Sequence, residues 1–346
     1  MIFLFIVILF LCDIITIIIY WGDFMPATIT HAFFAKDVYD ILPEEIAQKL
    51  DLDRLKMFSQ SVDSLMFYNL FSFFPGKDIR KFQGYFHEHN SQDFFVNLLK
   101  YIKIKNIEDV DTYTFMVGFI CHYALDSTLH PYVVYKTGRF DKNKPSTYKY
   151  NNIHAFMETF IDNDMVRRRM KCNPYRFNFI KYCFDTSPFS DELDKVINYT
   201  FYHTFKIRGM SMIYYKSLKQ MKWALRLFRK DRFGIKKFIY QLVDTLTPRN
   251  VYRFEAISYH YPLKDYHNYL NNNHTTWRNP CIYDMTSDES FIDLYLKSIQ
   301  LAKELIYDSF SYLSGEDIDL KKVFTNMSYV TGLDCDSKKP IQYFEF

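Results

Sequence analysis

Hydrophobic side chains recur at helical spacing along most of the chain, and one stretch is apolar on nearly every side. In this stretch, Phe115–Leu125, only His122 interrupts the apolar surface, and a helix that is hydrophobic all round lies inside a fold. No run of alternating β-branched residues stands out, and glycine and proline are scarce. The pattern predicts an all-α protein, a single multi-helix domain built around this central helix.

Further helices are expected on both sides of the central one. A first helix is predicted from about Thr30 to Leu42, where Pro43 ends it. Asn152–Met170 also reads as helical, and Ser287–Tyr312 opens with capping residues and continues as a long amphipathic helix. We expect a helical domain over residues 25–314, followed by a C-terminal tail at 315–346.

The N-terminal segment, residues 1–24, is set apart by its composition. Positions 2–19 hold fifteen Ile, Leu, Phe and Val residues, which outweigh the cost of Asp13 near their centre. The segment makes a poor signal peptide because no Lys or Arg precedes Lys36 and no small-residue cleavage site precedes Met25. It predicts a membrane-associated protein held by a single anchor; if translation starts at Met25, the protein is cytoplasmic.

Composition narrows the function classes. A chain of 346 residues with 49% hydrophobic side chains can bury a sizeable core, and its 35 Phe and 29 Tyr predict a core packed with aromatic rings. The net charge of +3 is too small to indicate a nucleic-acid partner by itself. Six scattered cysteines without a CxxC motif indicate neither a disulfide framework nor a thiolate zinc site.

The central helix carries three polar side chains with metal-ligand chemistry. His122, Asp126 and His130 follow each other at intervals of four residues, which keeps them on one side of a helix. Such groups are costly to bury unless they are paired or bind a metal. Pro131 disfavours helical geometry at His130, so we expect the helix to bend there and to carry two separate ligand sites.

Other imidazoles and carboxylates lie in the same half of the chain. His154 and Glu158 are four residues apart, a spacing by which one helix presents two ligands to a metal. Only one of His87 and His89 can face the core, because they are two residues apart. A set without thiols suits zinc or another borderline metal with open positions, and it is too large for one ion. The candidates are His31, Asp63, His87, His122, Asp126, His130, His154 and Glu158.

Several motifs in order along the chain carry a family resemblance. The most specific is G-F-x-x-H-Y-A-L-D-x-x-x-H-P at Gly118–Pro131, and it is accompanied by M-P-A-T-x-x-H at Met25–His31 and H-x-x-x-E-x-x-x-D at His154–Asp162. Later elements are H-x-x-W-x-x-P at His274–Pro280 and S-x-E-S-F at Ser287–Phe291. Together they resemble the bacterial zinc-dependent phospholipase C family, which shares its fold with zinc-dependent single-strand nucleases.

The resemblance implies a centre of two or three zinc ions. His87 is chosen over His89 because its distance from the Phe94–Phe95 pair fits the family better. Relatives also bind the third zinc through the amino group of their mature N-terminal residue, whereas 30 residues precede His31 here; a start at Met25 would supply the Pro26 amine. The implied ligands are Asp63, His87, His122 and Asp126 for one ion, His130, His154 and Glu158 for a second, and His31 with a shared Asp126 for a third.

The function implied by the resemblance is zinc-dependent phosphodiester hydrolysis. The leading expectation is a phospholipase C that cleaves glycerophospholipids with a metal-bound hydroxide, with Asp63 as the catalytic residue that orients or deprotonates the water. Its partner is then a phospholipid substrate or membrane surface, and no protein partner is implied. One alternative is a single-strand nuclease or another phosphodiesterase, because the basic segment Lys216–Lys237 suits either anionic substrate. The other is a membrane-tethered, non-catalytic zinc-binding protein.

Overall fold

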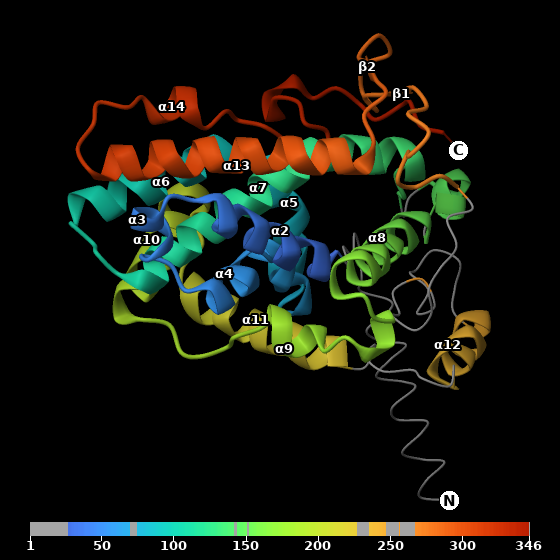
Figure 1. Cartoon of the computed structure of the whole chain (residues 1–346), viewed down its shortest axis with the longest axis horizontal. Helices are drawn as coiled ribbons and strands as arrows, with labels where there is room; N and C mark the ends of the chain where they lie inside the picture. Colours follow the sequence, from blue (N-terminus) through green and yellow to red (C-terminus); the bar gives the residue numbers. More distant parts are fainter. Residues whose placement is uncertain are drawn as a thin grey trace, which may run out of the picture.

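The computed structural model describes residues 27–69, 75–141, 144–150, 152–226, 235–246, 256 and 267–345. Within these ranges the only strands are β1 (Trp277–Arg278) and β2 (Thr286–Ser287), which pair antiparallel. Helices make up most of the rest and pack around one hydrophobic core (Figure 1). The predicted all-α, single-domain fold is therefore confirmed.

The helices follow the predicted order, and their ends differ from the predictions by a few residues. The first predicted helix is α2, and Pro43 separates it from α3. Before the central helix the chain forms α2 (Thr28–Ile41), α3 (Glu44–Ala47), α4 (Leu52–Phe58), η1 (Ser61–Phe67, a 3-10 helix), α5 (Lys77–Glu88) and α6 (Ser91–Ile104). From the central helix onward it forms α7 (Val110–Thr137), η2 (Pro145–Tyr150), α8 (Ile153–Met170), η3 (Pro174–Arg176), α9 (Phe179–Cys183), α10 (Asp191–Phe205), α11 (Met210–Leu225), α12 (Ile235–Leu246), α13 (Phe291–Leu313), α14 (Leu320–Val323) and η6 (Cys335–Ser337).

Helix α7 runs through the middle of the fold. Asp109 caps its start by accepting a hydrogen bond of 2.9 Å from the backbone N–H of Thr112. Helices α13, α4, α2 and α8 all pack against α7, which buries it on every side (Figure 1). The expected bend at His130 does not end the helix, which continues through Pro131 to Thr137. Packing on all sides holds the helical path there although Pro131 donates no hydrogen bond.

Aromatic rings form much of the core, as the composition predicted. Phe86 of α5 packs on Phe94 of α6 with ring centroids 5.1 Å apart, and Phe94 stacks on Phe119 of α7 at 5.2 Å. Phe119 in turn contacts Tyr214 of α11 at 5.8 Å, and Phe86 contacts Phe201 of α10 at 6.1 Å. The edge-to-face and stacked geometries among these buried rings join five helices into one core.

Gly118 is a point of close approach between α7 and α4, and it gives a testable prediction. A Cβ atom at this position would lie 2.5 Å from Cβ and 2.8 Å from the backbone carbon of Phe58. We therefore expect Gly118→Ala to lower the free energy of unfolding by roughly 1–3 kcal/mol, because the added methyl group overpacks the contact. Denaturant titration of the two proteins measures this difference. A variant at least as stable as the wild type would contradict the close helix contact.

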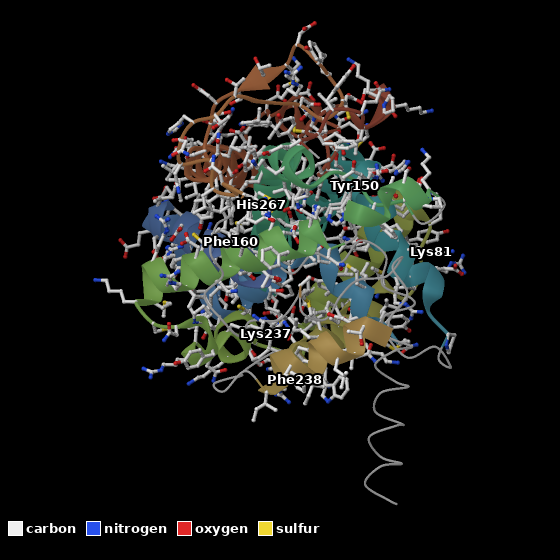
Figure 2. All side chains as sticks on the ribbon, turned by 90° about the vertical axis from the view of Figure 1, so that its right-hand side faces the viewer. Lys81, Tyr150, Phe160, Lys237, Phe238 and His267 are labelled. Carbon is white, nitrogen blue, oxygen red and sulfur yellow. The ribbon has the colours of Figure 1, made fainter. Side chains whose placement is uncertain are left out.

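Helix α12 is attached to the fold by one side only. Tyr240 and Val243 are buried, whereas Ile235, Phe238 and Leu242 are exposed, and Figure 2 shows Phe238 directed away from the body of the protein. The basic segment Lys216–Lys237 is divided between helices, because α11 ends at Leu225 and α12 begins at Ile235. Positions 227–234 between them lie outside the described residues.

The membrane localisation predicted from the N-terminal segment is contradicted. No helix within the described ranges is both long enough and apolar enough to cross a membrane. The most buried long helix, α7, carries His122, Asp126 and His130 along its length and packs inside the protein core. The predicted anchor at positions 1–24 lies outside the described residues, and the localisation prediction is not retained.

Candidate metal centre

The side chains predicted as metal ligands come from five elements, α7 and four that pack around it. All of them are buried except His154, whose side chain is 20% exposed. Helix α7 supplies three of them from one side, and its neighbours face that side. The contributors are His31 from α2, Asp63 from η1, His87 from α5, His122, Asp126 and His130 from α7, and His154 and Glu158 from α8.

A first group forms around Asp126. His31, Asp63, His122 and Asp126 each offer an atom that lies within 4.8 Å of the others, so the group could hold a metal ion. Asp126 Oδ1 lies 3.4 Å from His31 Nε2, and Asp126 Oδ2 lies 3.1 Å from His122 Nε2. His87 Nε2 adds to this cluster, 3.2 Å from His122 Nε2 and 3.3 Å from Asp63 Oδ1. Side chains from four elements thus converge on one buried point.

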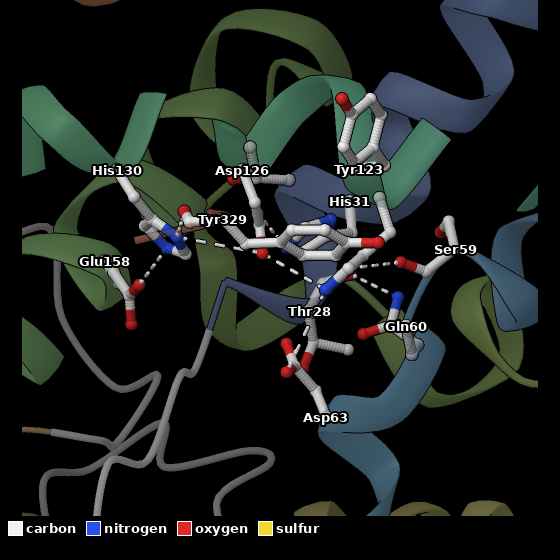
Figure 3. Close-up of polar contacts among 12 residues, drawn as sticks. Thr28, His31, Ser59, Gln60, Asp63, Tyr123, Asp126, His130, Glu158 and Tyr329 are labelled. Carbon is white, nitrogen blue, oxygen red and sulfur yellow. Dashed lines mark hydrogen bonds and ion pairs between the residues drawn. The ribbon is translucent and has the colours of Figure 1, made fainter. Parts of the chain in front are cut away.

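A second group adjoins the first. His130, His154 and Glu158 also offer atoms within 4.8 Å of one another. Glu158 Oε1 lies 3.1 Å from His154 Nε2. It also lies 3.6 Å from His130 Nε2, a contact drawn in Figure 3. Because His130 Nδ1 lies 3.7 Å from Asp126 Oδ2, Asp126 stands between the two groups. The rise of the helix, about 6 Å over four residues, is enough to distribute the ligands of α7 over two adjoining groups.

Backbone carbonyls fix the orientation of two of the imidazoles. His122 Nδ1 donates to the carbonyl of Ser59 at 3.0 Å, and His130 Nδ1 donates to the carbonyl of Tyr329 at 2.9 Å. A carbonyl only accepts, so the proton of each neutral imidazole sits on Nδ1. The lone pair on Nε2 is then free to bind a cation, which is the arrangement that metal-binding histidines generally use.

His87 and His89 have different environments in the structure. His87 is buried in the first group, whereas His89 stacks on the ring of Tyr85 at 4.0 Å and its Nδ1 donates to the Tyr85 carbonyl. Gln83, which the sequence did not single out as a candidate, contacts two members of the cluster. Its Nε2 lies 2.9 Å from Asp63 Oδ1 and 3.0 Å from His87 Nδ1. Its place one helical turn before His87 is the signal that could have found it.

Asp162 positions the helix that carries His31. Its carboxylate accepts hydrogen bonds from the backbone N–H groups of Ile29 and Thr30, at 3.2 and 2.7 Å, and from the Thr30 hydroxyl at 2.6 Å. These are free N–H groups of the first turn of α2, where a negative charge is favourable. Since Asp162 lies one turn after Glu158 on α8, the same helix supplies ligand candidates and anchors His31.

Burial sets the charge of most of these groups in the metal-free protein. It lowers the pKa values of His31 and His87 to about 3 and raises the pKa of Asp63 to about 6. Burial also disfavours charge on His130 and Asp126. Attraction to Asp126 and Glu158 outweighs this effect on His130, and attraction to His122 and His130 outweighs it on Asp126. The pKa of His130 consequently rises to about 9, while that of Asp126 falls well below its usual range.

The unpaired atoms of the cluster fit a bound cation. Asp126 Oδ2, Glu158 Oε2 and His31 Nδ1 are buried, and none of them makes a hydrogen bond in the part of the chain described. Buried polar atoms nearly always have a partner, so three buried atoms without one in a single cluster indicate that a bound cation is their partner. Imidazole nitrogens and carboxylate oxygens without thiolates are a donor set that suits zinc in catalytic sites.

A cavity of about 350 Å³ adjoins the second group. His87, His130 and His154 are part of its lining, which also includes Lys81 and Tyr150. Figure 2 shows Lys81 and Tyr150 on the same side of the molecule. The volume lies within the range of small-molecule binding pockets, so a substrate group can reach the candidate ligands from this side.

The protons held by the metal-free cluster predict how metal binding depends on pH. His130, with its pKa of about 9, and Asp63, with its pKa of about 6, must both lose their protons to bind a cation. Below each pKa the free protein holds a proton that the metal-bound protein does not. Apparent zinc affinity should therefore rise with pH up to about 9, by about tenfold per pH unit for each proton released. Chelator competition at several pH values measures it, and a flat profile would contradict this protonation pattern.

Buried imidazoles and carboxylates beside a cavity provide the ligands and the substrate access that a metal-dependent hydrolase needs. The model of the family described as zinc-dependent phospholipase C matches residues 30–204, just over half of the chain, and the chain belongs to this family. The matched segment includes all eight predicted ligands. No curated protein and no solved structure gives a significant match. Family and site together indicate a zinc-dependent, phospholipase C-like hydrolase.

Proposed function

We propose that the protein is a phospholipase C that hydrolyses the phosphodiester bond of glycerophospholipids with two or three zinc ions. The observation that carries the proposal is the convergence of both metal-ligand groups on Asp126, beside a cavity of about 350 Å³. The family's name also points to a phospholipid substrate.

Each ion has a proposed set of ligands in the two groups. Bound zinc supplies Lewis acidity, which lowers the pKa of water to about 7 and neutralises charge on a phosphoryl group. We assign Asp126 as the ligand shared between ions because it faces His31, His122 and His130. The sets are Asp63, His87, His122 and Asp126 for the first ion, His130, His154 and Glu158 for the second, and His31 with Asp126 for the third.

Asp63 is the proposed catalytic residue because it is a buried carboxylate of the first group and can accept a proton from a water molecule. Gln83 Nε2 donates to Asp63 Oδ1 at 2.9 Å and so leaves Oδ2 to orient a water molecule and accept its proton. In this role Asp63 takes a proton from the water molecule, and the oxygen of that water attacks phosphorus.

The cavity lining also favours an anionic substrate more generally. Lys81 and Arg139 line it, and Arg139 donates to Glu88 Oε1 at 2.8 Å. Cations at this position suit any phosphodiester, so a single-strand nuclease or another phosphodiesterase is the second candidate. The discriminating observation is the substrate that the zinc-loaded protein cleaves.

A parallel assay of two substrates tests the proposal. The purified protein is loaded with zinc and incubated with phosphatidylcholine in mixed micelles and, separately, with single-stranded DNA. We expect release of phosphocholine and diacylglycerol, and no cleavage of the DNA. Cleavage of DNA alone would favour the nuclease, and zinc binding without cleavage of either substrate would favour a non-catalytic zinc protein.

Two histidine variants provide the matched comparison for this assay. His154→Ala removes a proposed ligand of the second ion and should reduce hydrolysis by more than about 100-fold, which exceeds the usual effect of residues that only support a ligand. His203→Ala removes an exposed histidine of α10 that stacks on Tyr199, away from the cavity, and should retain wild-type activity. Equal activity of the two variants would contradict the assignment of His154.

A further inference from the structure

A loop close to the end of the chain, Ser328–Gly332, lies against the candidate metal centre. Its Tyr329 is completely buried, and the tyrosine ring contacts the imidazoles of His87 and His122 with centroids 5.2 and 5.8 Å apart. The loop is more than a hundred residues beyond the segment 30–204 that matches the family. It therefore adds to the centre from a part of the chain to which no role has been assigned.

The backbone of Tyr329 holds two candidate ligands that come from different helices. Its carbonyl accepts the hydrogen bond of 2.9 Å from His130 Nδ1 of α7 (Figure 3). Its N–H donates to the backbone carbonyl of His87, at the end of α5, at 2.8 Å. One residue therefore fixes the proton position of His130 and also ties the end of α5 to α7.

Internal hydrogen bonds give the loop a defined shape. Ser328 Oγ accepts from the N–H groups of Val330 and Thr331, both at 3.2 Å, and the Ser328 carbonyl accepts from Gly332 N–H at 3.0 Å. From outside the loop, Asn279 Nδ2 donates to the carbonyl of Thr331 at 2.9 Å. These contacts restrict where the Tyr329 carbonyl can point.

Gly332 seats the loop on α7 next to His130. It adopts a φ of +63°, and a Cβ atom there would lie 2.7 Å from the Ser127 carbonyl oxygen and 2.9 Å from Pro131 Cγ. Since Pro131 has no N–H to donate to Ser127, the helix surface is open to close approach at this turn. A side chain at position 332 would push the loop away from the helix and from His130.

We propose that the Ser328–Gly332 loop is a positioning element of the zinc centre. The Tyr329 carbonyl accepts the hydrogen bond of His130 Nδ1–H, which keeps His130 Nε2 directed toward Glu158. The Tyr329 N–H fixes the position of His87 through its backbone carbonyl. Zinc affinity thus depends on residues outside the matched segment. The inference rests on the proposed function only in taking His87 and His130 as zinc ligands.

The variant Gly332→Ala displaces the loop, and Gly209→Ala is its matched control. Gly209 has nearly the same backbone conformation, with a φ of +68°, but nothing lies within 4 Å of an added Cβ atom. We expect Gly332→Ala to bind zinc about 10–100-fold more weakly, as for other residues that support metal ligands. Gly209→Ala should bind it as the wild type does. Chelator competition gives both affinities without reference to activity.

A spectroscopic measurement on the zinc-free protein reports the His130 hydrogen bond directly. With ¹⁵N-labelled histidine, the wild type should show a proton on His130 Nδ1 that exchanges slowly because it is buried and bonded to the Tyr329 carbonyl. Gly332→Ala should lose this slow signal, and Gly209→Ala should keep it.

A second spectroscopic measurement uses protein in which cobalt replaces zinc. The visible spectrum of Gly332→Ala should differ from that of the wild type, whereas the spectrum of Gly209→Ala should not.

Two further variants keep the proposal open to refutation. Tyr329→Phe removes a buried hydroxyl that has no hydrogen-bond partner among the described residues, but it leaves both backbone contacts, so its zinc affinity should match the wild type. If Gly332→Ala does not fold, Ser328→Ala takes its place. This substitution removes the hydroxyl that accepts from two N–H groups of the loop, and it should weaken zinc binding by less than the roughly 10–100-fold expected for Gly332→Ala.

Unchanged zinc affinity in Gly332→Ala and Ser328→Ala would overturn the proposal. So would a loss in Tyr329→Phe as large as that in Gly332→Ala, because the effect would then come from the hydroxyl group. Failure of the proposed function would be seen differently, as wild-type protein that binds zinc and hydrolyses no phospholipid.

Discussion

Replacing Asp126 with asparagine is expected to remove most of the bound zinc and to reduce phospholipid hydrolysis by more than about 100-fold. The carboxylate lies within 4 Å of His31 and His122 of the first group and of His130 of the second, so it contacts both groups. Asparagine keeps the shape but loses the charge that offsets the cations. Zinc content by mass spectrometry and the initial rate of phosphocholine release measure the two effects.

Asp111→Asn provides the matched control on the same helix. Asp111 pairs with Arg54, with its Oδ1 3.0 Å from Arg54 Nε, and it takes no part in either ligand group. This variant should retain wild-type zinc content and hydrolysis even if it is somewhat less stable. An Asp126→Asn protein with full zinc content and activity would refute the shared role of Asp126.

Removing zinc is expected to destabilise the whole protein. Without a cation the buried centre contains carboxylate and imidazole atoms that lack hydrogen-bond partners, and the Nε2 atoms of His87 and His122 lie 3.2 Å apart. Because zinc binds the folded state, each ion present at 1,000 times its dissociation constant adds about 4 kcal/mol to the free energy of unfolding. Calorimetry of the zinc-loaded and chelated protein measures the change in melting temperature.

The response to other metals provides the control for zinc removal. Zinc added back should restore the melting temperature, whereas magnesium should not, because magnesium prefers oxygen ligands and most donors here are imidazoles. A melting temperature that does not change on chelation would show that the cluster is held together without metal.

The fold was predictable because its strongest signal is local. The all-round hydrophobicity of Phe115–Leu125 identified α7 as the central helix, and four-residue spacing identified the ligand side of α7 and of α8. The spacing of His87 and His89 predicted that only one of them faces the core, and the family resemblance favoured His87, which is the buried one.

The supports of the centre could not be predicted, because they act through the backbone or across long separations in the chain. Ser59 and Tyr329 orient imidazoles with their carbonyl groups, and any residue type carries a carbonyl. Tyr329 lies 199 positions beyond His130, in a stretch expected only to be a tail. The domain boundary placed at 314 stays a prediction.

The effect of Pro131 on α7 depends on tertiary packing. Proline usually ends or bends a helix, and α7 continues past Pro131 because packing on every side compensates for the lost hydrogen bond; the expected bend stays a prediction. The membrane localisation suggested by the hydrophobic N-terminal positions was wrong, since no helix of the described residues is long and apolar enough to cross a membrane; positions 1–24 lie outside these residues.

Anomalous diffraction at the zinc absorption edge, from crystals of the zinc-loaded protein, tests the central claim most directly. The account predicts anomalous peaks at two places: beside Asp126 among His31, Asp63, His87 and His122, and among His130, His154 and Glu158. Well-ordered crystals with no anomalous peak at either place would contradict it.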